Sequence, residues 1–121
     1  MGTLAAGTVV TVSFPFSDLS QSKLRPAVVL AGIGRDDWIL CQITSNPYSD
    51  PKAVIITDDN FATGSLQKTS FARPGKLFTT NRQLIVTDLG VLKKEAFEKI
   101  VNAVIAILKD ALVTYPNITP I

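Results

Sequence analysis

Short strand-like segments separated by closely spaced turn residues occupy residues 8–87 of this sequence. Over 8–14, Val10, Val12 and Phe14 alternate with residues of the opposite face, which is the period of a half-buried strand. Many short strands joined by tight turns predict a mainly β chain, folded as a small barrel or sandwich. The other candidate strands span residues 27–30, 38–44, 53–56, 69–72, 76–79 and 84–87. A turn over 32–37 separates the first two of them.

The last part of the chain has a different period. Between Phe97 and Leu112 the apolar side chains recur at steps of three and four, which places them on one face of a helix. The pattern predicts a long C-terminal helix over 93–113, followed by a loosely held tail over 114–121 that contains two prolines. A single subunit can account for burial of the apolar helix face.

Length and composition fit one globular domain over residues 1–121. The chain is 46% hydrophobic and 18% charged, which supplies a core and excludes wholesale disorder. No apolar run approaches the roughly 18 residues of a membrane-spanning helix, and the first 13 residues carry no recognisable targeting pattern. We therefore expect no membrane association and a cytoplasmic location.

The scarcity of histidine and cysteine restricts the chemistry. The chain has no histidine, so it lacks the commonest general acid or base near neutral pH and the usual zinc ligand sets. Its single cysteine, Cys41, lies on the strand face shared by Ile39 and Ile43, which favours a core thiol over a nucleophile. We expect no metal and no cofactor.

Positive charge is concentrated in the second half of the chain. Residues 1–60 carry four basic and six acidic side chains, whereas residues 61–121 carry eight and four. The stretch from Gln67 to Thr87 contains four basic residues and no acidic one. Such a segment suits contact with phosphates or with an acidic peptide.

A candidate anion site follows from two strand ends. Arg25 closes a loop of serines, Asp18 and Lys23 at the start of a buried strand, while Thr44 and Ser45 end another strand. If these ends are neighbours, a guanidinium and two hydroxyls meet where a phosphate would fit. The competing interpretation is an exposed arginine next to a proline, and a turn that begins at the Thr-Ser pair.

Ordered motifs cover nearly the whole chain. They are Gly7-x-Val9-Val10, Phe14-Pro15-Phe16-Ser17-Asp18, Lys23-x-Arg25-Pro26-Ala27-Val28-Val29-Leu30, Trp38-x-Leu40-x-Gln42-Ile43-Thr44-Ser45, Gly64-x-Leu66-x-Lys68-x-Ser70, Lys76-Leu77-Phe78-Thr79 and Ile85 to Gly90-x-Leu92. In this order and spacing they resemble the toxins of PemK/MazF-type toxin–antitoxin systems.

The resemblance implies an SH3-like small β-barrel (PemK/MazF/CcdB-like) with a C-terminal helix, assembled as a homodimer. It also implies a metal-independent endoribonuclease that cuts single-stranded RNA at short sequences. In such toxins the ribose 2′-hydroxyl attacks its own phosphodiester, which leaves a 2′,3′-cyclic phosphate and a 5′-hydroxyl. The implied partner is a cognate antitoxin whose acidic C-terminal segment covers the RNA groove.

The resemblance assigns catalysis to Arg25 and Thr44. A fixed guanidinium suits the negative charge of a phosphorane-like transition state, whereas arginine carries its proton too tightly to serve as a general base. Thr44 would orient the 2′-hydroxyl or a phosphate oxygen, and the general base stays open. The candidate RNA-binding residues are Phe16, Ser17, Asp18, Lys23, Gln42, Ser45, Lys68, Ser70, Arg73 and Lys76.

One segment departs from the family pattern. The resemblance also implies that a serine before the basic strand contacts substrate, and Ser70 occupies that position. Many members follow this serine with an aliphatic run and a glutamine, where this chain has the residues 71–76, Phe-Ala-Arg-Pro-Gly-Lys. The change replaces amide hydrogen bonds with cationic contacts to phosphate and alters the expected sequence preference. Two alternatives stay open: a non-catalytic gyrase-binding toxin of the CcdB type, and a paralogue that binds RNA without cutting it.

Overall fold

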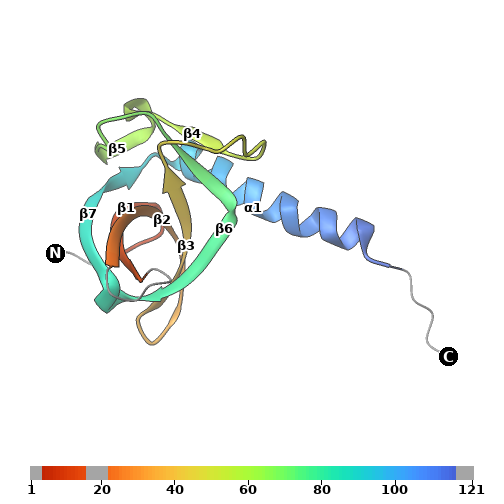
Figure 1. Ribbon diagram of the computed structural model, residues 1–121, viewed down its shortest axis with the longest axis horizontal. Coiled ribbons are helices and arrows are strands. Elements are labelled where there is room, and N and C mark those ends of the chain that lie inside the picture. The colour runs from red at the N-terminus through yellow and green to blue at the C-terminus, as the bar shows by residue number, and fades with distance from the viewer. Residues whose placement is uncertain (1–3, 16–21, 117–121) are drawn as a thin grey trace.

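The computed structural model of the protein describes residues 4–15 and 22–116. Seven antiparallel strands and one long helix make up most of this part of the chain (Figure 1). The strands are β1 (Thr8–Pro15), β2 (Ser22–Gly34), β3 (Asp37–Thr44), β4 (Val54–Ile56), β5 (Phe61–Gly64), β6 (Ser70–Asn81) and β7 (Ile85–Leu92). The helix is α1 (Lys94–Thr114), and two 3₁₀ turns, η1 (Asp58–Asn60) and η2 (Arg82–Leu84), precede β5 and β7.

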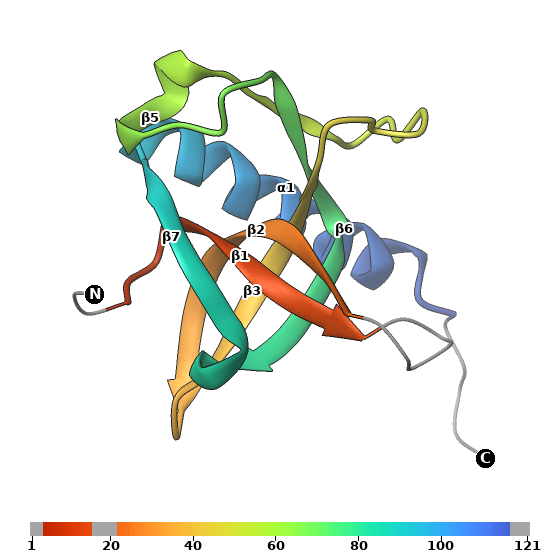
Figure 2. The same cartoon turned by 60° about the vertical axis from the view of Figure 1, so that its left-hand side comes forward.

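The strands form one sheet in the order β4-β6-β3-β2-β1-β7-β5. Figures 1 and 2 show this sheet curled into a half-barrel, with α1 beginning beside β4 and β5. The predicted architecture, a small β-barrel with a C-terminal helix, is therefore confirmed. The helix itself differs from its predicted limits by one residue at each end.

The sheet carries an apolar core on each of its two faces. One cluster includes Val9, Val28 and Ile43 and packs against Ile100 of the helix; we call this side the helix face. A second cluster lies on the opposite face and consists of Leu4, Val10, Val12, Ala27, Val29, Leu40 and Ile85. Because successive residues of a strand point to opposite faces, neighbours in the central strands are both buried. The prediction of a half-buried first strand is thus wrong, since Val9 and Val10 are both fully buried.

Two strands are longer than predicted. The predicted turn over 32–37 contracts to Arg35 and Asp36, which both have positive φ values, of 52° and 64°. A two-residue turn of this kind matches the twist of the flanking strands, so β2 and β3 continue up to it. The segments 69–72 and 76–79 form the single strand β6, in which an irregularity opposite Cys41 and Ile43 accommodates the residues between them.

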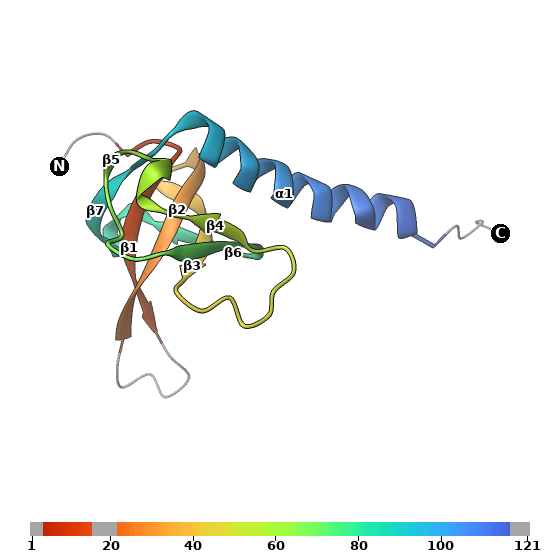
Figure 3. The ribbon, with the colours of Figure 1, turned by 90° about the horizontal axis from the view of Figure 1, so that it is seen from above.

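The apolar face of α1 is only partly covered. Ala96 and Ile100 are buried, but Leu108 and Leu112 are 62% and 77% exposed. Figure 3 shows the reason, because the C-terminal half of α1 extends beyond the barrel on the side of β6. The expectation that one subunit accounts for burial of this face is therefore wrong for the second half of the helix. Within the residues described, no helix combines the length and hydrophobicity needed to cross a bilayer.

Close approach of β5 to β7 explains two glycines that lie in strands. Gly64 has a φ of 79°, and a Cβ atom there would overlap the carbonyl oxygen of Leu89. Gly90 opposes Gly64 in the ladder and is crowded in the same way by the backbone of Thr63. Only glycine permits this spacing, so the pair sets how tightly β5 closes one edge of the sheet.

We predict that Gly64→Ala lowers the free energy of unfolding by about 2–4 kcal/mol, from steric overlap added to an unfavourable positive φ. The matched control is Gly34→Ala, because Gly34 has a φ of 97° but a Cβ atom there would have no neighbouring atom within 4 Å. This control should lose only about 1–2 kcal/mol. Urea denaturation measures both values, and equal losses would contradict the steric argument.

Candidate functional site

The register of β2 and β3 brings Arg25 and Thr44 to the same face of the sheet. Ala27 and Gln42 are Cα partners in this ladder. Arg25 lies two residues before Ala27, and Thr44 lies two residues after Gln42, so alternation keeps all four side chains on one face. Arg25 and Thr44 are the next residues on this face beyond Ala27 and Gln42, the last paired residues of the ladder. The structure thus puts the two strand ends singled out in the sequence on the same face of neighbouring strands.

Two lysines extend this face. Lys23 lies two residues before Arg25 on β2 and is exposed. On β6, Phe78 is the Cα partner of Leu40, and alternation places Lys76 on the side of Phe78. The residues Lys23, Arg25, Gln42, Thr44 and Lys76 are called the basic face below.

The basic face continues the second apolar cluster of the sheet. Val12 is the Cα partner of Arg25, and Val12 and Ala27 belong to that buried cluster. Arg25 is half-buried, so its side chain lies at the edge of this apolar cluster. A guanidinium in such surroundings acts more strongly on a bound phosphate than one in open water.

Hydrogen bonds fix the position of the Thr44 hydroxyl. Its Oγ1 donates to the carbonyl oxygen of Asn46 at 2.9 Å and accepts from the backbone N–H of Asn46 at 3.1 Å. The Asn46 side chain in turn accepts from the backbone N–H of Tyr48 at 3.0 Å. This local turn holds Thr44 at the end of β3, where Phe71 of β6 is its Cα partner.

Arg73 has a structural partner. Its Nε donates to Oδ2 of Asp50 at 3.0 Å, and its guanidinium lies 5.9 Å from the centre of the Tyr48 ring. The pKa of Asp50 is lowered mainly by a hydrogen bond from the backbone N–H of Lys52, and next by the hydrogen bond from the Arg73 side chain. Arg73 therefore ties β6 to the loop after β3. Its contact with RNA stays a prediction, and that contact competes with the ion pair.

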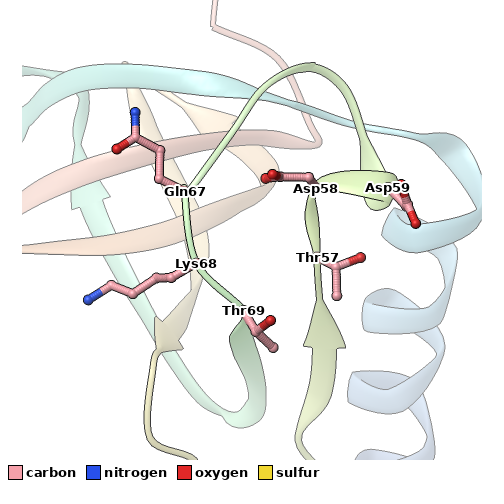
Figure 4. A pocket seen from close by; sticks show the side chains of 6 residues that line it. All are labelled: Thr57, Asp58, Asp59, Gln67, Lys68 and Thr69. Atoms are coloured by element: carbon pink, nitrogen blue, oxygen red, sulfur yellow. The ribbon is translucent and has the colours of Figure 1, made fainter.

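Ser70 lies on the face of the sheet opposite the basic face, and Lys68 lines a polar cavity. Ser70 is 3% exposed, its hydroxyl donates to the Lys68 carbonyl at 3.2 Å, and its Cα partner is the buried Ile56 on the helix face. Lys68 is exposed beside a polar cavity of about 310 Å³ (Figure 4). This cavity is lined by Thr57, Asp58, Asp59, Gln67, Lys68 and Thr69. Ser70 is therefore on the other side of the sheet from Arg25 and Thr44, and the contact of Lys68 with RNA stays a prediction.

The remaining predicted residues fall into two groups. Ser45 follows Thr44 directly and is exposed at the border of the basic face. Phe16, Ser17 and Asp18 lie outside the described residues. Their predicted contacts with RNA stay predictions.

Cys41 is a core thiol, as predicted. It is fully buried, and its Sγ donates to the carbonyl oxygen of Arg73 at 3.1 Å, which anchors the irregular part of β6. Burial raises the pKa of the thiol from 9.0 to about 12. The thiolate needed for nucleophilic attack is therefore absent at neutral pH. In the ranges 4–15 and 22–116, no cluster of three metal-ligating acidic or cysteine side chains occurs.

We predict that iodoacetamide at pH 8 alkylates Cys41 at least about 1,000-fold more slowly in the folded protein than in denaturant, because about three pKa units separate the two thiols. The raised pKa also makes stability pH-dependent. The contribution of the buried, protonated thiol to the free energy of unfolding is complete below pH 9 and is lost as the pH rises through 9 towards about 12. Mass spectrometry follows the alkylation, and equal rates in both states would contradict this account.

Sequence reasoning missed Phe71 and Asn46 as parts of the site. Phe71 lies beside Thr44 only through the β3–β6 register, which no local pattern reveals. Asn46 carries a readable pattern, because a threonine two residues before an asparagine at a strand end favours a side-chain-to-backbone turn. That pattern would have predicted a fixed Thr44 hydroxyl.

Comparison with known protein families places the chain. A model described as the PemK-like, MazF-like toxin of type II toxin-antitoxin systems matches residues 5–108. The chain belongs to this family. The resemblance found in the sequence motifs is thereby confirmed, while no curated protein matches the chain significantly.

Solved structures of low sequence identity share the fold of this toxin. A MazF structure from Deinococcus radiodurans has a TM-score of 0.69 at 17% identity, covering 90% of this chain and 99% of the other. An endoribonuclease in complex with its cognate antitoxin, from a mycobacterial species, has a TM-score of 0.67 at 15% identity and covers 90% and 96%. Mycobacterium tuberculosis toxin MazF-mt6 has a TM-score of 0.65 at 15% identity, with coverage of 84% and 96%. The predicted barrel class is confirmed by these matches.

Proposed function

We propose that this toxin is a metal-independent endoribonuclease that cleaves single-stranded RNA, such as mRNA, on the basic face. The observation that carries the proposal is the β2–β3 register, which puts Arg25 and Thr44 on one face with Lys23 and Lys76. Proteins of the same fold include ones described as endoribonucleases. This activity belongs in the cytoplasm, where mRNA is found.

The proposed reaction is an internal transfer of the phosphodiester. The ribose 2′-oxygen attacks phosphorus, the bond from phosphorus to the 5′-oxygen breaks, and the products are a 2′,3′-cyclic phosphate and a 5′-hydroxyl. The proton of the 2′-hydroxyl passes to a base that is not assigned, and the leaving 5′-oxygen gains a proton. Arg25 stabilises the charged phosphorane, because its donors are fixed and matched to phosphate oxygens.

Thr44 positions the substrate in this reaction. Its hydroxyl proton is donated to the Asn46 carbonyl oxygen, so the fixed Thr44 oxygen can still accept a hydrogen bond from a 2′-hydroxyl. Lys23 and Lys76 flank the centre and hold neighbouring phosphates, while Gln42 and Ser45 offer further hydrogen bonds. Phe71, the Cα partner of Thr44, offers a ring for base stacking.

We predict that Arg25→Ala lowers the rate of RNA cleavage by about 10²–10³ in the presence of excess chelator, because one transition-state donor is lost. Arg35→Ala is the matched control, since it removes the same charge from the exposed turn at the other end of β2. Mapping the fragment ends of a long RNA should give cyclic phosphates and 5′-hydroxyls for wild type and control.

Equal cleavage by the Arg25 and Arg35 variants would contradict the assignment of Arg25. Intact RNA with all folded proteins would overturn the endoribonuclease proposal. That second result would favour the gyrase-binding alternative or the RNA-binding paralogue. An RNA-binding assay separates these two, because only the paralogue is expected to bind RNA.

The exposed half of α1 supports a homodimer as part of the proposed function. Ile105, Leu108, Leu112 and Tyr115 are 41%, 62%, 77% and 72% exposed, although all are large and apolar. Exposed apolar side chains of this number on one projecting helix are typical of an interface. A second copy of the chain would cover them in an isologous contact.

We predict that Leu108→Glu combined with Leu112→Glu converts a dimer into a monomer, because charges enter the apolar contact. Asn102→Glu is the control, since Asn102 is exposed on the polar side of the same helix. Light scattering after size exclusion measures the mass, and circular dichroism checks the fold. A double variant that stays dimeric would contradict the helix-mediated interface.

We also propose that the cognate antitoxin inhibits the toxin through an acidic C-terminal segment laid on the basic face. The net positive charge of residues 61–121 and the exposed lysines of the basic face suit such a segment. Its carboxylates would compete directly with RNA phosphates for Lys23, Arg25 and Lys76.

A further inference from the structure

A groove separates the outer edge of β4 from the first turns of α1. It has a volume of about 600 Å³, within the range of ligand-binding clefts. Figure 4 shows Thr57, at the end of β4, beside the helix. The lining residues are Ala53, Val54, Ile55, Ile56, Thr57, Asp59 and Asn60 from the strand side, and Ala96 and Lys99 from the helix.

The wall formed by β4 is an open strand edge. In the sheet order β4 is terminal and pairs only with β6 among the described strands. Alternate residues of an edge strand direct their backbone N–H and C=O groups away from the existing ladder. The segment Val54–Ile56 also lacks the charged or proline residues that commonly block such an edge.

Charge gives the groove a direction. The backbone N–H of Lys93 donates to the Asn60 carbonyl at 2.8 Å, which fixes the start of α1 beside the end of the β4 segment. From there the helix passes Ala96 and reaches Lys99, so Asp59 lies towards one end of the groove and Lys99 towards the other. The exposed Lys52, just before the strand, adds a second cation at the Lys99 end.

We infer that this groove binds an extended segment of the antitoxin, which adds to the sheet as an eighth strand antiparallel to β4. In that orientation the C-terminal end of the segment meets Lys99 and Lys52, so carboxylates there are favoured, and the backbone pairs with the edge of β4. Apolar side chains at alternate positions fill the space against Ala96. The inference rests on the proposed toxin–antitoxin function for the identity of the partner.

The groove is a site separate from the basic face. Crossing the sheet from β2, a line starts at Arg25 and passes Thr44 on β3 and Phe71 on β6 before it reaches Ile55 on β4. The added strand would be the next one beyond β4. At about 5 Å between neighbouring strands, the added strand lies on the order of 20 Å from Arg25 when measured along the curled sheet. Its binding should therefore anchor the antitoxin while leaving the RNA site open.

The test uses the full-length toxin and a synthetic acetylated heptapeptide in which valine and threonine alternate before two C-terminal glutamates. Two control peptides have proline at the centre, which removes ladder hydrogen bonds, or the glutamates moved to the N-terminal end. NMR titration should give saturable amide shifts at residues 53–57 and 96–99 with the first peptide only. Lys99→Glu should raise its Kd by about fivefold, whereas Lys94→Glu, on the same helix outside the groove, should not.

Other outcomes would overturn the inference. Absence of shifts, shifts confined to the basic face, or equal binding of the proline peptide would exclude strand addition. Shifts at 53–57 that depend on protein concentration without peptide would show that a second copy occupies the edge. An RNA cleavage assay with saturating peptide separates the two proposals. If the peptide binds but the protein cleaves no RNA, the endoribonuclease proposal is refuted and the peptide-binding groove stands. If the protein cleaves RNA but the peptide does not bind, only the groove proposal is refuted.

Discussion

The antiparallel register between β2 and β3 is the constraint on which the site depends. Val28 opposite Cys41 and Val29 opposite Leu40 are fully buried on opposite faces of the sheet, so each face fixes the alternation. A slip of one residue would exchange the two cores and move every side chain to the wrong side. The same register sets Arg25 and Thr44 on one face, which means that core packing positions the proposed catalytic pair.

The packing of the helix leaves two surfaces uncovered, an apolar helix face and a groove with charged ends. The barrel is too short to cover a helix that ends at Thr114, so the second half of α1 presents Leu108 and Leu112 to solvent. Near its start, α1 leaves a groove beside β4 instead of closing that edge. One surface suits a second copy of the chain and the other an extended peptide. Assembly and anchoring of the antitoxin would then use opposite ends of one helix.

Much of the fold could be predicted from the sequence because local periodicity reports which residues are buried. The period of three and four located α1, and the resemblance carried by the ordered motifs pointed to Arg25 and Thr44, which share one face of the sheet. The sequence could not reveal that Val9 and Val10 are both buried, since that depends on cores on two faces. Nor could it show that Ser70 points to the helix face, or that Arg73 is paired with Asp50, because both depend on long-range register.

The central claim is that single-stranded RNA binds the basic face at the junction of β2, β3 and β6. NMR titration with a short RNA that carries 2′-O-methyl groups, and therefore cannot be cut, tests it most directly. The account predicts saturable amide shifts at residues 23–27, 42–46, 71 and 76, weakened by added salt as phosphate contacts require. Shifts confined to the β5 and β7 edge, or binding that is indifferent to salt, would contradict it.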